Sequence, residues 1–452
     1  MALNGTRFPG ADRPGLHRHT RITVRPRTVE DIAEILTNPK AHPSPVRPIG
    51  ADYSITRCTN TDGGTALHLD AFDKILGYDE GCVRVQAGVR VAALVRTLAE
   101  RGLELPLTPD IGNISVGALA VSTLPQPSYR EDCAQTASCV TEIKLVTPQG
   151  RQITVTERDR DLMRVLRSSH GLLGVVHEVS LRVEPLTPVR IEYRSHTFAE
   201  FAARHASIVE TPGALRFHVA PFSDRITVER RVRDPDESVT RSGIWQIRNS
   251  VMRNVLPAFG SSIGSVLATP GLRHAVLTGV HRALHAAQPR TTRGVVMHAH
   301  EWMRELPTDP AKARHAYSLW AFPQADFPKL LEDYAAFCSA HQKRYRYRCN
   351  LVTVASRLHR DRSALFSPSH AGDRVTLEPS SPGDPGFEDF LIDFNEFASN
   401  AGGTPTLNQT RALTVEQLTR ALGERARLFA ALRRRTDPAN RMRNSYFAQL
   451  LG

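Results

Sequence analysis

A short apolar segment that runs directly into a loop of small and polar residues is the feature that most restricts the fold of this chain. Val46–Gly50 (VRPIG) has the composition of a strand, and ADYS follows at once. Small side chains let a ligand approach the main chain, and such a loop leaves backbone N–H groups free. The sequence therefore predicts a strand end that can bind an anion.

The length of the chain points to more than one hydrophobic core. It has 452 residues, of which 41% are apolar, the composition of a folded globular protein. A single core usually stops growing below this size, so two packed domains are expected. A strand that ends at Pro185 predicts the first domain boundary near Pro188.

Short-range patterns predict several local elements. Residues 21–37 predict a strand, a turn and then a helix capped by Thr28. A helix is expected within Val91–Leu103, with Gly102 as a plausible stop, and a β-hairpin over residues 140–157. Near the C-terminus, residues 415–436 predict one strong helix.

Charge and cysteine usage argue against two classes of partner. The net charge is +12, but acidic residues are interspersed with the basic ones and no nucleic-acid-binding motif accompanies them. We therefore expect no nucleic-acid partner. The six cysteines form neither a CxxC pair nor the spaced cysteine–histidine sets that zinc requires, so no metal site is expected.

No membrane partner and no export are expected. The best candidate span, Ser261–Val280, contains Pro270, Arg273 and His274, and no run reaches about 18 consecutive apolar residues. The N-terminus is polar and lacks the apolar stretch of a secretory signal. With its cysteines as reduced thiols, the protein is expected in the cytoplasm.

Four segments of this sequence follow one another in an informative order. They are RPIGADYS (47–54), LPLTPDIGNISVGALAVST (105–123), SSHGLLGVVHEVSLRVEP (168–185) and DPANRMRNSYFAQLLG (437–452). Together they resemble the superfamily of vanillyl-alcohol oxidase and p-cresol methylhydroxylase (PCMH), most closely its aldonolactone and alditol oxidases. The resemblance implies an α+β fold with a two-lobed, PCMH-type FAD-binding domain (20–187). It also implies a mixed α/β cap domain with an antiparallel sheet for the substrate (188–400), and a C-terminal segment that packs back on the FAD-binding domain (401–452).

The resemblance also assigns residues to the cofactor. It implies that the first segment wraps the FAD pyrophosphate, the second runs beside the isoalloxazine, the third holds the adenine end, and the tail returns to the flavin. The implied cofactor-binding residues are Ile49, Gly50, Ala51, Asp52, Tyr53, Ser54, Asp110, Ser115, Val116, Gly117, Ser122, Thr123, Gly171, Gly174, Val175, Val176, Asn444 and Tyr446. For Asn444 and Tyr446, simple packing is an equally good interpretation.

Two departures from the family pattern concern the flavin. Tyr53 stands where covalent members carry the histidine that is bonded to the flavin, so non-covalent FAD is predicted. A thioether link through Cys133 is left open as an alternative. Leu124 and Pro125 replace the family's His-Gly, which alters the wall of the flavin pocket.

Arginines in the second half are candidates for the substrate site. In the family, an alcohol C–H is aligned on the flavin N5 while a base takes the hydroxyl proton. The segment KRYRYRCNL alternates, which predicts a strand with Arg344, Arg346 and Arg348 on one face. Arg346 and Arg348 are candidate catalytic residues, able to hold an anionic group or to face the flavin. A solvated sheet face is the alternative.

A histidine-containing segment supplies further candidates. HAHEWMRELP (298–307) resembles the Glu-Met-rich strand of the relatives, and makes His298, His300 and Glu301 candidate pocket residues. A histidine with a pKa near neutrality is a suitable proton acceptor. A structural role is the more common fate of a single histidine.

Asn408 and Gln409 replace the basic residues that alditol and lactone oxidases carry in the same loop. Gln409 is a further catalytic candidate, although an amide can orient a substrate but cannot act as a base. The resemblance implies an FAD-dependent oxidoreductase that oxidises an alcohol (CH–OH) of a small polyhydroxylated, sugar-like or specialised-metabolite substrate by hydride transfer to flavin N5. The electron acceptor is expected to be O2 or another carrier. The alternatives are a dehydrogenase that uses a non-oxygen acceptor and a flavin-retaining binding protein.

Overall fold

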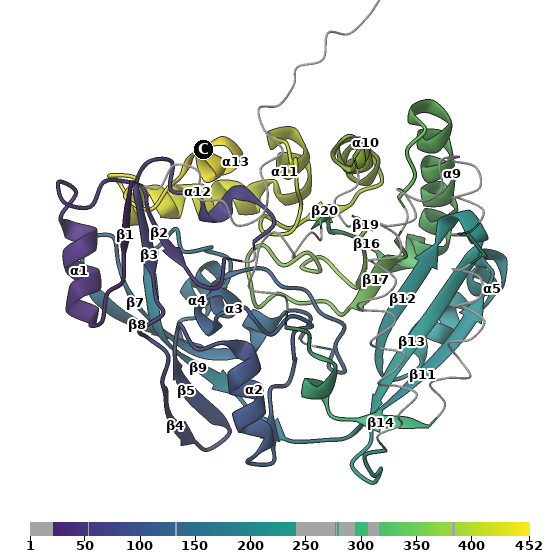
Figure 1. Ribbon diagram of the computed structural model, residues 1–452, viewed down its shortest axis with the longest axis horizontal. Coiled ribbons are helices and arrows are strands. Elements are labelled where there is room, and N and C mark those ends of the chain that lie inside the picture. Colours follow the sequence, from purple (N-terminus) through teal and green to yellow (C-terminus); the bar gives the residue numbers. More distant parts are fainter. Residues whose placement is uncertain are drawn as a thin grey trace, which may run out of the picture.

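Two lobes and a larger cap sheet make up the described part of the chain (Figure 1). The computed structural model describes residues 21–52, 54–131, 133–240, 276, 278–279, 294–305, 316–349, 351–381 and 385–452. In Figure 1 the lobes lie on the left, the cap sheet lies on the right, and the C-terminal helices run along the top.

The first lobe is a three-stranded parallel sheet in the order β1-β3-β2. Its elements are β1 (Ile22–Val24), α1 (Val29–Thr37), β2 (Val46–Ile49), η1 (Arg57–Thr59) and β3 (Thr65–His68). Thr28 caps α1: its hydroxyl accepts from the Asp31 N–H at 3.1 Å, and the Asp31 carboxylate accepts from the Thr28 N–H at 3.0 Å. This reciprocal cap satisfies N–H groups that a helix start leaves open, and it confirms the predicted strand, turn and helix.

The second lobe is a five-stranded antiparallel sheet in the order β4-β5-β9-β7-β8. The elements between residues 75 and 185 are β4 (Ile75–Asp79), β5 (Cys82–Gln86), α2 (Val91–Ala99), β6 (Leu103–Glu104), α3 (Val116–Val121), η2 (Thr136–Cys139), β7 (Val140–Val146), β8 (Gln152–Thr156), α4 (Arg160–Leu166), β9 (Val175–Arg182) and β10 (Glu184–Pro185). Pairing of β7 with β8 confirms the predicted hairpin. The helix predicted from Val91 ends at Ala99, and Gly102, the predicted stop, turns the chain with φ 68° before Leu103 pairs with β10.

The cap is built on an eight-stranded antiparallel sheet in the order β14-β11-β13-β12-β17-β18-β16-β20. Its elements are β11 (Val189–His196), α5 (Phe198–Glu210), β12 (Ala214–Ala220), η3 (Pro221–Ser223), β13 (Arg225–Arg233), β14 (Val295–Met297), η5 (Ala299–Trp302), β15 (Ala316–Tyr317), β16 (Trp320–Pro323), η6 (Gln324–Asp326), α9 (Phe327–Tyr345), β17 (Thr353–Leu358), β18 (Arg374–Leu377), β19 (Ser380–Ser381), α10 (Phe387–Asn400) and β20 (Thr404–Pro405). Helices α5 and α9 cover its outer face, where the rings of Phe201, Phe217 and Phe327 pack with centroids 5.1–5.7 Å apart. The opposite face of the sheet is therefore directed at the lobes.

The C-terminal residues contact the first lobe. The tail holds α11 (Val415–Leu422), α12 (Glu424–Thr436) and α13 (Ser445–Leu451). The single helix predicted for 415–436 is wrong, because Gly423 has a φ of 48° and separates two helices. Arg441 donates to the carbonyls of Ile35 and Leu36 at 2.6 and 2.8 Å, so residues at opposite ends of the sequence are joined. The domain limits at 187 and 400 stay predictions.

The strand predicted at KRYRYRCNL is also wrong. Helix α9 continues through Arg344 to Tyr345, and Arg346 ends it in the left-handed conformation with φ 56°. Leu330, Tyr334 and Cys338 are buried at helical spacing along α9, and this longer apolar stripe outweighs the short alternation that follows it. The arginines of this segment consequently share no strand face.

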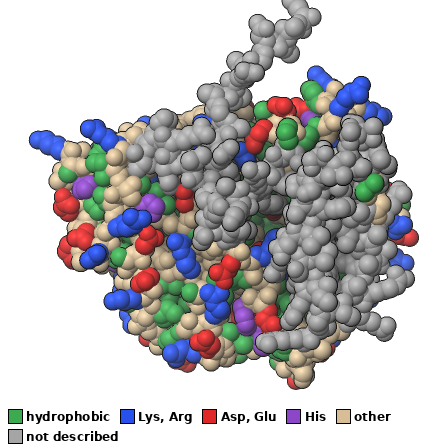
Figure 2. All heavy atoms as spheres, viewed as in Figure 1, with side chains coloured by type: hydrophobic (Ala, Val, Ile, Leu, Met, Phe, Trp, Pro, Cys, Tyr) green, Lys and Arg blue, Asp and Glu red, His purple; other side chains and the backbone are tan. Residues whose placement is uncertain are grey.

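The surface carries both signs of charge. On the face shown in Figure 2, Lys and Arg side chains are interspersed with Asp and Glu over the coloured area. None of the helices described is both long and apolar enough to cross a membrane.

Candidate active site

Two of the predicted cofactor segments meet at the end of β2. A Cβ added to Gly50 would lie 2.2 Å from the Oγ of Ser115, so the absence of a side chain is what lets these segments touch. Ser115 in turn caps α3, and its Oγ accepts from the Ala118 N–H at 3.3 Å. The loop after β2 and the start of α3 thus form one surface.

The third predicted segment joins the same place. Gly171 has a φ of 74°, and a Cβ there would lie 2.7 Å from the Cγ of Pro48 in β2. His170 donates its N–H to the carbonyl of Val121, at the end of α3, at 2.9 Å. The segments around Gly50, Gly117 and Gly174 are therefore neighbours in space.

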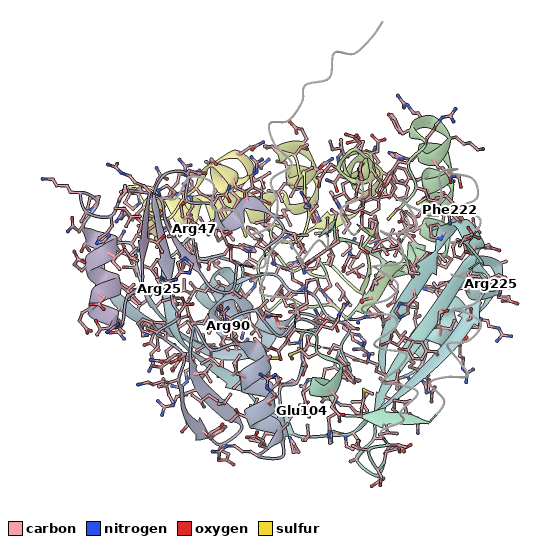
Figure 3. All side chains as sticks on the ribbon, in the orientation of Figure 1. Arg25, Arg47, Arg90, Glu104, Phe222 and Arg225 are labelled. Atoms are coloured by element: carbon pink, nitrogen blue, oxygen red, sulfur yellow. The ribbon has the colours of Figure 1, made fainter. Side chains whose placement is uncertain are left out.

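Arg47 holds these segments together. It is 2% exposed, and it donates to the carbonyls of His170, Met442 and Cys58 at 2.6, 2.8 and 3.0 Å. Burial lowers the pKa of its guanidinium to about 10. Figure 3 shows Arg47 close to the C-terminal helices. One side chain thus ties β2, the third segment and the tail.

Buried polar atoms around this meeting point fit a dinucleotide. Side-chain atoms of Thr123, Gln135, His170 and Asn408 are buried without a hydrogen-bond partner in the described part of the chain. Buried polar groups cost free energy unless they are hydrogen-bonded, and FAD offers many donors and acceptors. Thr123 and His170 lie in segments predicted to hold FAD, Gln135 precedes η2, and Asn408 lies in the loop after β20. The residues present therefore fit that cofactor.

Several predicted cofactor residues make contacts inside the protein. The N–H groups of Val116 and Gly117 donate to the carbonyls of Val89 and Ala87 at 2.9 and 2.8 Å, which docks α3 on the second lobe. Asp52 has a φ of 57° and accepts from Thr59 at 3.2 Å. These bonds hold α3 and the loop after β2 in place, and they leave Val116 and Gly117 without an N–H for a ligand.

The remaining positions can be placed in the same way. Ile49 ends β2, Ser54 lies 2.9 Å from the Cys58 thiol, Ser122 ends α3, and Val175 and Val176 begin β9; Ala51 lies in the loop after β2. Tyr53 lies outside the described residues. The thiol of Cys133 is buried, 2.8 Å from the Ser138 hydroxyl, and a link from it to the flavin stays open.

Asn444 and Tyr446 both serve the packing of the tail. The Asn444 amide donates to the carbonyls of Asn60, Arg57 and Cys58, and its oxygen accepts from the Phe447 N–H at 3.1 Å. The Tyr446 hydroxyl donates to the carbonyl of Leu407 at 2.6 Å. The packing interpretation accounts for the contacts of both side chains.

The loop after β2, the start of α3 and the segment around Gly171 form the predicted cofactor cradle. The close approach at Gly50 gives a direct test of it. Gly50→Ala is expected to displace Ser115 and to weaken FAD retention by tenfold or more, because the new Cβ overlaps Oγ. The measurement is the ratio of flavin to protein after gel filtration. Gly372→Ala is the matched control, since a Cβ there meets nothing within 4 Å. Equal FAD retention by the two variants would contradict the cradle.

The inner face of the cap sheet carries a buried charged network. The Glu229 carboxylate is bound by Arg231, His218 and the Tyr193 hydroxyl at 2.6, 2.9 and 3.0 Å. Burial alone would raise the pKa of Glu229, but Arg231 and His218 hold it well below its usual value. The Arg231 guanidinium also lies 4.4 Å from the centre of the Trp302 ring. The network is thus buried, charged and hydrogen-bonded.

One ion pair joins this face to the FAD-binding half. Arg216, in β12, contacts the carboxylate of Asp110, in the loop before α3, at 2.5 Å. Both side chains are largely buried, at 11% and 21% exposure. Burial would raise the pKa of Asp110, but Arg216 and Arg231 keep it below its usual value. The Asp110 carboxylate is therefore an anion fixed against the cap sheet.

Glu378 lies beside this ion pair. It follows β18 and pairs with Val354 of β17, which pairs in turn with His218 of β12, so all three occupy one row of the sheet. Burial raises the pKa of Glu378 to about 7, offset in part by Arg216. The Gln409 amide donates to the Tyr317 hydroxyl at 3.3 Å. Burial, and after it the charge of Glu378, raises the pKa of that tyrosine.

The other predicted catalytic residues have different surroundings. Glu301 accepts from the His298 N–H at 3.2 Å and so caps the η5 turn that contains His300. This turn docks on the flavin half, because Arg304 donates its N–H to the Asp110 carbonyl at 2.7 Å. The segment was expected as a strand and is a short 3-10 turn after β14.

Arg346 and Arg348 lie away from the cluster formed by Asp110, Arg216 and Glu378. Arg346 is exposed at the end of α9. Arg348 is buried, donates to the Thr278 hydroxyl at 2.8 Å and stacks 4.0 Å from the centre of the Phe222 ring. Figure 3 shows Phe222 at the edge of the cap far from Arg47. Of the predicted catalytic residues, the structure brings Gln409 into the cluster.

Sequence reasoning missed Arg216, Glu229 and Glu378. The alternation of charged and apolar residues in LRFHVA (215–220) was a usable signal for Arg216, because it describes a strand with one polar and one buried face. No local pattern marks Glu378. Its position depends on the pairing of three strands.

Comparison with known proteins agrees with this architecture. Residues 20–156 match the FAD binding domain family, and residues 179–450 match the D-arabinono-1,4-lactone oxidase family. L-gulono-1,4-lactone dehydrogenase of Mycobacterium tuberculosis is 26% identical over 49% of this chain and 51% of its own length. L-galactono-1,4-lactone dehydrogenase 1 of Oryza sativa is 30% identical over 46% of this chain and 36% of its own. The matches thus span about half the length, or less, of these relatives.

Solved structures share the fold. Cholesterol oxidase from Brevibacterium sterolicum superposes with a TM-score of 0.73 at 17% identity, over 95% of this chain and 94% of the other. A solvent-stable cholesterol oxidase gives 0.70 at 15% identity, over 96% of each chain. At this identity the likeness concerns the fold alone, and it confirms the predicted α+β class.

The fold, the cradle and the matched domains define an FAD-binding protein of the PCMH superfamily. The predicted resemblance and the FAD cofactor are confirmed. The D-arabinono-1,4-lactone oxidase family matches residues 179–450, which are more than half of the sequence, so the chain belongs to this family. The cytoplasmic location stays a prediction, since the rice relative is named as mitochondrial.

Proposed function

We propose that this protein oxidises an alcohol carbon (CH–OH) of a small polyhydroxylated, sugar-like substrate, with non-covalently bound FAD. The observation that carries the proposal is the contact between Asp110 and Arg216, which brings the flavin-side loop against the polar face of the cap sheet. A hydroxyl-rich substrate needs both donors and acceptors. Arg216, Tyr317, Gln409 and Glu378 supply both at this junction.

The cofactor accounts for the redox chemistry, and the chain positions the reactants. FAD, held by the loop after β2 and the segments around α3 and Gly171, supplies a two-electron acceptor. Asp110 keeps the Arg216 guanidinium in place, and Gln409 and Tyr317 orient substrate hydroxyls by hydrogen bonds. The names of the relatives and of the family support sugar lactones as the first substrates to test.

Anaerobic flavin reduction tests the proposal. L-gulono-1,4-lactone, L-galactono-1,4-lactone, D-arabinono-1,4-lactone and the corresponding alditols are mixed with the purified yellow protein, and at least one is expected to bleach the visible flavin absorbance. Dithionite is the control that shows the flavin to be reducible. A flavin that dithionite bleaches and no polyhydroxylated compound does would contradict the proposal. After acid precipitation the yellow colour should stay in the supernatant, because the FAD is not covalently bound.

A dehydrogenase is the second candidate, favoured by the names of the mycobacterial and rice relatives. Stopped-flow reoxidation separates the two. Fast reaction of the reduced protein with O2 indicates an oxidase. Slow reaction with O2 beside fast reaction with a dye indicates a dehydrogenase.

A further inference from the structure

Glu378 differs from two other carboxylates, Glu229 of the cap sheet and Asp110 of the loop before α3. Glu229 is bound by three side chains, and Asp110 is paired with Arg216. Within the residues that the structure describes, the Glu378 carboxyl makes no hydrogen bond or ion pair, and the residue is partly exposed. A carboxyl in this condition is free to accept a proton from a ligand.

The strand register fixes where Glu378 lies. Val354 pairs with both His218 and Glu378, and Ser356 pairs with Arg216. Residues paired across antiparallel strands project from the same face, and residues two apart on one strand do so too. Glu378 therefore shares its face with Arg216 and is directed, like Arg216, toward the Asp110 loop.

We propose that Glu378 is the catalytic residue that accepts the proton of the substrate hydroxyl, an inference that rests on the proposed function. The substrate O–H bond breaks and its proton passes to the Glu378 carboxylate. The hydrogen on the same carbon leaves with its electron pair to FAD, and the carbon and oxygen form a carbonyl. The substrate loses two electrons and two hydrogens, and FAD is reduced by two electrons.

The pKa values of Asp110 and Glu378 agree with a proton-accepting role for Glu378. Asp110 and Glu378 lie in one cluster, yet Arg216 and Arg231 hold the pKa of Asp110 below its usual value, while burial raises the pKa of Glu378 to about 7. The charged groups that act on Glu378 are Arg216, Asp110 and Arg304. Two carboxyl groups whose pKa values are pushed apart take different roles, one as a fixed anion and one as a proton carrier. A proton acceptor works best with a pKa near the working pH.

The kinetic test compares two glutamine variants. Glu378→Gln keeps the size of the side chain and removes its ability to take a proton, so flavin reduction by the lactone or alditol that reduces the wild type is expected to slow by roughly a hundredfold or more. Glu332→Gln, exposed on α9, is the matched control and should be unchanged. The wild-type rate should rise with pH through about 7, and Glu378→Gln should lose this dependence.

A second readout needs neither substrate nor flavin reduction. Because the folded pKa is about 7 and the ordinary value is 4.5, the stability contributed by Glu378 is complete below pH 4.5 and is lost as the pH rises through 7. Below pH 4.5, Glu378→Gln and the wild type should have the same melting temperature. Above pH 7, the melting temperature of Glu378→Gln should be several degrees higher than that of the wild type.

The outcomes separate the two proposals. If no compound reduces the wild-type flavin, the proposed function fails and the proton-accepting role fails with it. If the wild type is reduced and Glu378→Gln is reduced equally fast, only the inference about Glu378 is overturned. A melting difference that does not change with pH would also overturn it, because Glu378 would then titrate as an ordinary surface carboxyl.

Discussion

Arg216→Met is expected to destabilise the protein by about 3–5 kcal/mol and to remove nearly all flavin reduction by substrate. Arg216 is the partner of the Asp110 carboxylate at 2.5 Å, and both side chains are largely buried. Without the arginine, Asp110 is left as a buried anion whose ordinary partner is gone. The loop that carries Asp110 leads into α3, so its displacement also disturbs the cofactor cradle.

A double-mutant cycle distinguishes the charge from the packing. In the double variant Asp110→Asn/Arg216→Met, neither buried charge remains. Much of the stability lost in Arg216→Met should therefore return, while turnover stays low. Arg230→Met is the matched control: it also removes an arginine of the cap sheet, one paired with Glu192 at 3.3 Å in a more exposed position. Urea unfolding gives the free energies, and anaerobic bleaching gives the rates. A double variant that is as unstable as Arg216→Met would contradict the explanation.

Arg47→Met is expected to lower stability by about 3–5 kcal/mol and to release FAD. The guanidinium donates to the carbonyls of His170, Met442 and Cys58, and hydrogen bonds to a charged group contribute about 1.5–3 kcal/mol each. Methionine relieves the burial of a charge, which offsets part of this loss. The buried carbonyls of His170 and Met442 lose this donor, while the Cys58 carbonyl keeps its hydrogen bond from the Asn444 amide.

The loss of FAD should be accompanied by release of the tail. Met442 lies just before α13, so limited proteolysis is expected to cut Arg47→Met near residue 440 before the wild type is cut. Arg25→Met, at a surface arginine of the same lobe that pairs with Asp70, is the control and should retain both FAD and the tail. Normal FAD content in Arg47→Met would show that the tail and the cradle are independent.

Local elements could be predicted because their causes lie within a few residues. The Thr28 and Asp31 cap, the turn between β7 and β8 and the glycine of the β2 loop each depend on neighbours in the sequence. The strand predicted around Arg346 was wrong because a longer pattern outweighed the local one. Its alternation covered a few residues, while the buried stripe of α9 extended the helix over 19.

The cluster of charges could not be predicted from local patterns. Arg216 and Asp110 are 106 residues apart, and Glu378 reaches the same face through the pairing of β12, β17 and β18. Which side chain becomes the partner of a buried carboxylate is decided by sheet register. A shift of one residue would turn each of these side chains to the opposite face.

The sequence by itself determined the superfamily, the FAD cofactor and the small residues where the predicted cofactor segments meet, because close approach of main chains admits few side chains at those positions. Only the tertiary structure decided which polar groups lie together at the inner face of the cap sheet. Burial and charge pairing, which set the state of Asp110 and Glu378, arise when the cap sheet closes on the flavin-side loop.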